Sequence, residues 1–116
     1  MSSDLVFKAK VVELILMKEP EDAIKMLSQH YRVEEPLLKV GRAKGYSSKV
    51  LGVYTSRRKT ILVINSDVLY NPFVIIHEFY HHLRTHGHLH KGTEKYADIF
   101  AKDFIEAYRT LHGRLS

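Results

Sequence analysis

The pentapeptide HEFYH, at positions 77–81, constrains the fold more than any other part of this sequence. Its two histidines are four residues apart, so on an α-helix their rings lie one above the other on the same face. The apolar PFVII at 72–76 precedes it and would bury one face of that helix. We therefore predict a helix that opens at Asn71–Pro72, reaches Thr85 or His86 and is stopped by Gly87.

Helical spacing also marks the start of the chain and its end. Ser2 or Ser3 can cap a helix that begins near Asp4, and Pro20 suits the first turn of a second helix, PEDAIKMLSQHY, at 20–31. Near the C-terminus, Thr93 is a good N-cap for a helix that runs from Glu94 to about Leu111.

Three short β-branched runs separate these helical segments. They are LLKVGRAKG at 37–45, KVLGVYT at 49–55 and KTILVIN at 59–65, with SRRK at 56–59 as the hairpin loop between the last two. Such runs predict a small, three-stranded, mainly antiparallel sheet. The expected fold class is α+β over a single domain, residues 1–116: N-terminal helices, the sheet, the helix that carries HEFYH and a C-terminal helix that carries a glutamate.

Composition excludes several classes of protein. The chain has no cysteine, which rules out a disulfide scaffold and a thiolate metal site. Neither a secretory signal nor an apolar run long enough to span a bilayer is found, so we expect a cytoplasmic protein. The net charge of +5 could indicate binding to nucleic acid, but the cations are spread along the chain. The local cluster of cations at 57–59 is what a charged hairpin tip would contain. Nucleic-acid binding is therefore not expected.

The histidine pair points to a metal site, because neutral imidazoles at this spacing can share one ion and zinc suits them. Glu78 follows the first histidine directly, which places it beside the metal, where it can take a proton from the attacking water. A third ligand is expected from Glu94 or Asp98, which lie four residues apart on the next helix. Position favours Glu94 on the metal and Asp98 behind a ligand histidine. The reverse assignment stays open, as do other divalent metals.

With HEFYH at 77–81, the segment EKYADIFA at 94–101 resembles the gluzincin metallopeptidases, whose pattern is HExxH with a downstream ExxxD. It is also similar to the catalytic domains of CAAX-processing and heat-shock membrane endopeptidases and to ImmA/IrrE-type metallopeptidases. The length and the order of the elements most resemble the minigluzincins, which are minimal soluble versions of those membrane enzymes.

This resemblance implies a zincin-like fold and cleavage of a peptide or protein substrate. It also implies zinc ligation by His77, His81 and Glu94, Glu78 as general base and acid, and Asp98 as support for a ligand histidine. Part of KVLGVYT or KTILVIN would pair with the substrate backbone. The metzincin class is excluded, because position 84 is arginine and position 87 is glycine. A catalytically latent, zinc-binding regulatory module is the alternative function.

Other polar residues near the pattern leave several roles open. His82 faces about 100° away from His81 and is not expected to be a ligand. The histidines after the helix could form a solvated loop, a second metal site or a further ligand; they are His86, His88 and His90. The donor that would stabilise an oxyanion is not identified by the sequence; the candidates are Tyr96, Tyr108, Arg109 and His112.

Overall fold

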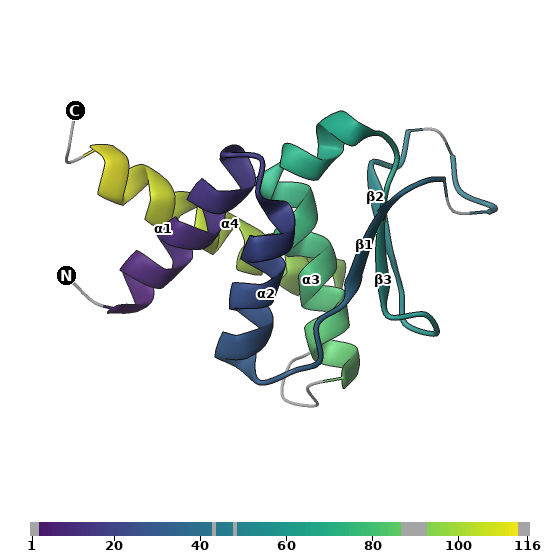
Figure 1. Cartoon of the computed structure of the whole chain (residues 1–116), viewed down its shortest axis with the longest axis horizontal. Helices are drawn as coiled ribbons and strands as arrows, with labels where there is room; N and C mark the ends of the chain where they lie inside the picture. Colours follow the sequence, from purple (N-terminus) through teal and green to yellow (C-terminus); the bar gives the residue numbers. More distant parts are fainter. Residues whose placement is uncertain (1–2, 43, 48, 87–92, 114–116) are drawn as a thin grey trace.

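A computed structural model gives the fold of the whole chain and describes all residues except 1–2, 43, 48, 87–92 and 114–116. The described residues form four α-helices, a small sheet and a 3₁₀ turn, and the helices and strands are labelled in Figure 1. In chain order the elements are α1 (Ser3–Leu16), α2 (Pro20–Tyr31), β1 (Leu37–Val40), β2 (Gly52–Thr55), β3 (Thr60–Val63), η1 (Ser66–Tyr70), α3 (Pro72–His86) and α4 (Glu94–Gly113). The α+β class is confirmed.

Local signals set most of the helix boundaries. Pro20 lies in the first turn of α2, and that helix ends where Arg32 takes a left-handed conformation with φ of 57°. The Asn71 side chain accepts a hydrogen bond from the Val74 N–H at 3.2 Å, directly before the proline that opens α3. Thr93 Oγ1 accepts from the Tyr96 N–H at 3.2 Å and so caps α4. The predicted helix starts at Pro20, Pro72 and Glu94 are confirmed.

The sheet has strand order β1-β3-β2 and is mixed. β2 pairs antiparallel with β3 through a hairpin whose tip is 56–59, as predicted. β1 pairs parallel with β3, so the expectation of a mainly antiparallel sheet is wrong for one of the two pairings. The physical reason is the loop between β1 and β2, which carries the chain past β3 so that β2 takes one edge and β1 the other.

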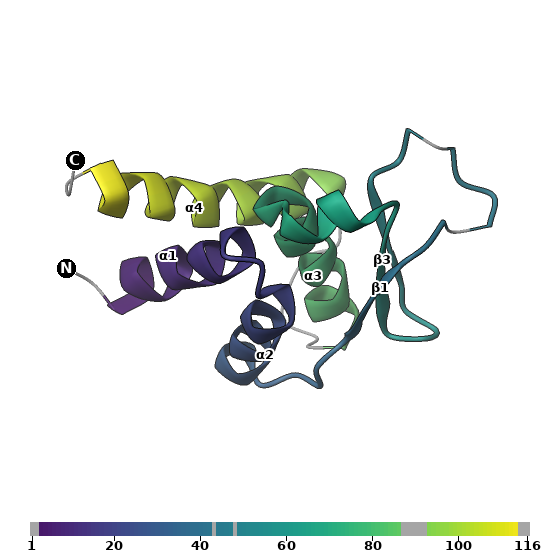
Figure 2. The ribbon, with the colours of Figure 1, turned by 45° about the horizontal axis from the view of Figure 1, so that its top comes forward.

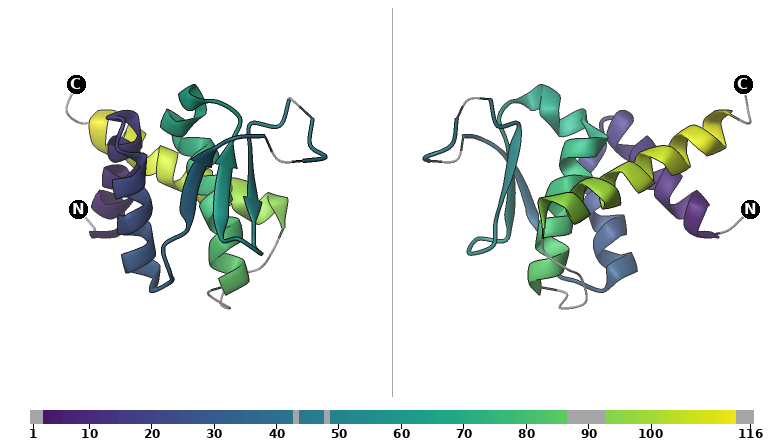
Figure 3. Two further views of the ribbon diagram at one scale, coloured as in Figure 1. Left: turned by 45° about the vertical axis from the view of Figure 1, so that its right-hand side comes forward. Right: turned by 180° about the vertical axis from the view of Figure 1, so that it is seen from behind.

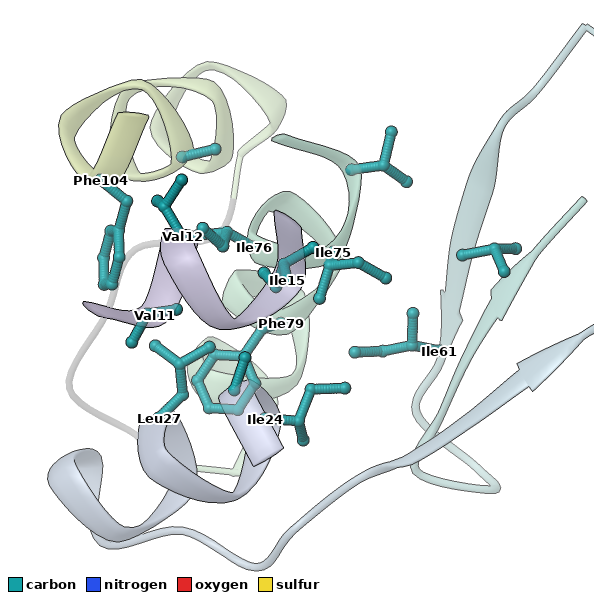
Figure 4. Close-up of a cluster of buried hydrophobic side chains, with 14 of the residues drawn as sticks. Val11, Val12, Ile15, Ile24, Leu27, Ile61, Ile75, Ile76, Phe79 and Phe104 are labelled. Carbon is teal, nitrogen blue, oxygen red and sulfur yellow. The ribbon is translucent and has the colours of Figure 1, made fainter. Parts of the chain in front are cut away.

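Helix α3 lies between the sheet and the other helices (Figure 3). Its lead-in is buried at Val74, Ile75 and Ile76, so the apolar segment before HEFYH anchors the helix as expected. Phe79 of the same helix is fully buried among side chains of α1, α2 and α3 (Figure 4). Because this helix is held on several sides, its polar residues have fixed positions.

Helices α1 and α4 lie side by side along the part of the molecule away from the sheet (Figure 2). Phe104 of α4 packs with Phe7 of α1, with ring centroids 6.0 Å apart. Lys8 forms ion pairs with Asp4 and Asp103 at the surface of this pair of helices. Within the residues that the structure describes, no helix combines the length and apolar character needed to cross a bilayer.

Candidate metal centre

His77 and His81 present their Nε2 atoms to each other from consecutive turns of α3. The two nitrogens are 3.3 Å apart. Both side chains are largely buried, with only 11% and 13% of their surface exposed. This is the arrangement that the spacing in HEFYH predicts for a helix.

Glu94, the first residue of α4, closes the cluster. Its Oε2 lies 2.9 Å from His77 Nε2, and its Oε1 lies 2.7 Å from His81 Nε2. Thr93 caps α4, so the helix begins at Glu94, next to the two histidines of α3. The carboxylate therefore lies between the two helices. Donor atoms of these three residues all lie within 4.8 Å of one another.

The donor set fits a zinc ion. Tetrahedral coordination with bonds of about 2.0–2.1 Å places neighbouring donor atoms about 3.3–3.4 Å apart. The separation of 3.3 Å between the two Nε2 atoms meets that condition, whereas the carboxylate oxygens, at 2.9 and 2.7 Å from the nitrogens, are closer and lie at hydrogen-bond distance. Burial lowers the pKa of His81, which favours the neutral imidazole that a metal requires.

Asp98 stands behind His77, one turn further along α4. Its Oδ1 is 3.0 Å from His77 Nδ1, the nitrogen that faces away from Glu94. Nδ1 has no hydrogen-bond partner in the geometry of the structure, so Asp98 is in close contact with the ring without a formed hydrogen bond. On the other side the Phe73 ring lies 5.8 Å from the imidazole, centroid to centroid. These neighbours hold the ring with Nε2 toward the cluster.

Glu78 approaches the cluster from the floor of a cleft. Its Oε2 lies 3.9 Å from His77 Nε2. The side chain is almost fully buried, and this burial raises the pKa of its carboxyl to about 8, with a further contribution from the negative charge of Glu94. A cation at the cluster would act in the opposite direction, because positive charge favours the carboxylate.

The cleft has a volume of about 410 Å³ and lies between the sheet and α3. One wall is formed by β2 and the segment before it, and the other by α3 and the start of α4. The lining residues are Tyr46, Val50, Gly52, Val53, Tyr54, Ser56, Glu78, His81, Arg84, Thr85 and Glu94. Because β2 is an edge strand, the sheet presents one of its unpaired sides next to the cluster.

Comparisons of this chain with protein-family models, with curated protein sequences and with solved structures find no match. The resemblance to the minigluzincins therefore stays a prediction.

Tyr54 and His82 form a hydrogen-bonded connection beside the cleft that the sequence does not reveal. Tyr54 Oη is 2.6 Å from His82 Nδ1, and the other nitrogen of the ring is 2.6 Å from the Glu34 carbonyl oxygen. A carbonyl only accepts, so His82 Nε2 carries the proton and Nδ1 accepts from the tyrosine hydroxyl. As expected, His82 lies apart from the metal ligands.

The histidines that follow HEFYH do not join the cluster where the structure describes them. The His86 ring lies 4.9 Å from the ring of His82 and 6.4 Å from that of Tyr54, centroid to centroid, on the side of α3 that faces the sheet. His88 and His90 lie outside the described residues.

Three oxyanion candidates are wrong by position. Tyr108, Arg109 and His112 follow Glu94 by at least 14 residues on one helix, which at 1.5 Å per residue places them about 20 Å or more from the cluster. Tyr96 is two residues after Glu94 and so projects from the opposite side of α4. The polar groups that do line the cleft include Tyr46 and Arg84, which no sequence pattern marks as candidates.

Proposed function

We propose that this protein is a zinc-dependent metallopeptidase. The observation that carries the proposal is the convergence of two imidazole nitrogens and one carboxylate, with an additional buried carboxyl beside them, at the floor of an open cleft. The same donor types are found in catalytic zinc sites of the His₂Glu type. When bound, zinc would polarise the substrate carbonyl and lower the pKa of the attacking water.

The chain's own residues then have distinct tasks. His77, His81 and Glu94 hold the metal, and Asp98 orients His77 through its second ring nitrogen. Glu78 takes the proton from the attacking water and returns it to the amine that leaves. Its position at 3.9 Å from His77 Nε2 supports this role, because a group that close to the cluster reaches the atoms that react there.

The edge strand supports a peptide as substrate. β2 lies along the cleft, and an extended peptide can add to such an edge through backbone hydrogen bonds. Of the two runs expected to take this role, KVLGVYT contains β2, whereas KTILVIN contains the central strand β3, whose two sides are already paired. Backbone pairing by itself places the chain without regard to most of its side chains, so any sequence preference depends on the groups that surround the strand.

The test compares the parent protein with Glu78→Gln. Elemental analysis measures the metal of both proteins, and digestion of an unbiased peptide library measures cleavage. We expect equal zinc content and a rate that falls by at least about 10²-fold in the variant, because the base is lost while the ligands stay. Equal cleavage by both proteins would refute the assignment of Glu78. Bound zinc with no cleavage by either protein would instead support the latent regulatory module.

A further inference from the structure

The net positive charge of this protein is confined to the part of the chain that forms the sheet. Residues 36–66 contain seven lysines and arginines and neither aspartate nor glutamate, whereas the other 85 residues contain eleven cations and thirteen acids. The seven are Lys39, Arg42, Lys44, Lys49, Arg57, Arg58 and Lys59. Outside this segment the chain is slightly acidic.

This basic segment forms one wall of the cleft. Six of its residues line the cavity: Tyr46, Val50, Gly52, Val53, Tyr54 and Ser56. Exposed cations adjoin these residues in the chain, with Arg42 and Lys44 before them, Lys49 among them, and Arg57 and Arg58 after them. The loop that carries the first three projects beyond the sheet (Figure 2). Of the seven cations, Lys59 alone has an ion pair among the described residues, with Glu34 at 2.6 Å.

Arg84 adds a cation on the facing wall. It is exposed, lines the cleft from α3 and follows His81 by three residues. Its Nε–H donates to His81 Nδ1 at 3.4 Å, and none of the described carboxylates forms an ion pair with it. The residues outside the description contain no aspartate or glutamate side chain that could do so. Positive charge therefore borders the cleft on both sides.

The acids that line the cleft are already engaged: Glu78 lies at its floor, and Glu94 stands beside it at the start of α4. Glu94 contacts both histidines, and Glu78 is buried beside them. An extended ligand that pairs with β2 would place its backbone over this floor and direct alternate side chains toward the walls. Walls with unpaired cations favour negatively charged side chains at those positions.

We propose that the cleft selects acidic peptide segments, whose aspartates and glutamates contact Arg84 on one side and the cations around β2 on the other. This inference rests on the proposed function, since it names the class of peptide that the proposed peptidase would cleave. A peptide fits better than a nucleic acid, because the free edge of β2 offers backbone hydrogen bonds that an extended peptide completes.

The binding test uses the zinc-loaded Glu78→Gln protein, which keeps its ligands while cleavage is suppressed. The probes are two fluorescein-labelled, end-blocked peptides that differ only in carrying glutamate or lysine at alternate positions. We expect the glutamate peptide to bind about tenfold more tightly, since several surface contacts of this kind add up to such a factor. Its advantage is expected to shrink between about 0.1 M and 1 M salt.

Charge reversal locates the contacts. Arg84→Glu and Arg57→Glu in the same background are each expected to abolish or reverse the preference. Lys39→Glu is the matched control, because it makes the same change of charge on β1, at the opposite edge of the sheet, and is expected to keep the preference. Unchanged zinc content and thermal unfolding in all three variants exclude loss of the site itself.

The outcomes separate this inference from the proposed function. Cleavage by the parent protein without any preference between the two peptides would overturn the inference and leave the peptidase intact. A preference for the glutamate peptide in binding, with no cleavage of it by the parent protein, would support the acidic ligand and contradict the peptidase. Displacement of the bound peptide by a single-stranded oligonucleotide at lower concentration than by unlabelled glutamate peptide would overturn the inference in favour of nucleic acid.

Discussion

The hydroxyl of Tyr54 donates to Nδ1 of His82 at 2.6 Å and so ties the edge strand β2 to the helix that carries His77 and His81. His82 is fully buried and follows His81 directly. Because its other nitrogen donates to the Glu34 carbonyl, the same ring also anchors the segment that leads into β1. One side chain therefore fixes the distance between the wall of the cleft and its floor.

We expect Tyr54→Phe to destabilise the protein by about 1–3 kcal/mol, because it leaves a buried acceptor on His82 without its donor. The ring itself stays, so little packing is lost. Urea denaturation of the parent and the variant measures the difference. Tyr46→Phe is the control, since that side chain also lines the cleft but is 53% exposed. If both variants unfold at the same urea concentration, the hydrogen bond between Tyr54 and His82 does not contribute to stability.

Gly52 sets how closely β2 approaches α3. A Cβ at this position would lie 2.7 Å from Val74 Cγ1 and 3.5 Å from the Glu78 side chain. We expect Gly52→Ala to cost about 1–3 kcal/mol, as overpacking does in other interiors, and to displace the strand from Glu78. Denaturation measures the first effect and the peptide-library digest the second.

The matched variants for Gly52 change the neighbour that would clash and a second glycine, at which an added Cβ would have no atom within 4 Å. Combined with Val74→Ala, the substitution at Gly52 is expected to cost less than the sum of the two single changes, because the alanine removes the clashing methyl. Gly113→Ala introduces a Cβ with no atom within 4 Å and is expected to be neutral or slightly stabilising. Additive costs in the double variant would contradict a steric role.

Much of the site followed from local sequence, because its parts are local. The distance between the histidines depends on helix geometry alone, and the start of α4 depends on Thr93, which lies directly before Glu94. Both features need only a few consecutive residues. The sequence also predicted the hairpin tip at 56–59 from a polar run between two apolar ones.

The features that sequence did not reveal depend on contacts between distant segments. The parallel pairing of β1 with β3 joins strands with β2 between them in the chain, and periodicity carries no information about strand order. Tyr54 and His82 are 28 residues apart, so nothing local marks them as partners. The 3₁₀ turn η1, with Asn65 as its cap, also lacks an apolar period by which to recognise it.

High pH is expected to weaken the fold through Tyr31. Burial raises the pKa of its hydroxyl from 10.0 to about 12 in the folded protein. A raised folded-state pKa means that stability is intact below about pH 10 and is lost as pH rises through about 12, because the unfolded chain releases the proton more readily. Denaturant midpoints over this range test the effect. Tyr31→Phe is expected to reduce the loss of stability with rising pH. Part of that loss remains, because the pKa of Tyr54 is also raised to about 12.

Metal affinity distinguishes the ligand carboxylate from the supporting one. Glu94 contacts the Nε2 atoms of both histidines, whereas Asp98 contacts the far nitrogen of His77. We expect Glu94→Ala to abolish tight zinc binding and Asp98→Ala to weaken it by about 10–100-fold, as loss of a partner behind a ligand histidine does in other zinc sites. Competition with a chelating dye measures both. Glu106→Ala, an exposed acid further along α4, is the control and is expected to bind as the parent does. A larger loss from Asp98→Ala than from Glu94→Ala would establish the reverse assignment that the sequence left open.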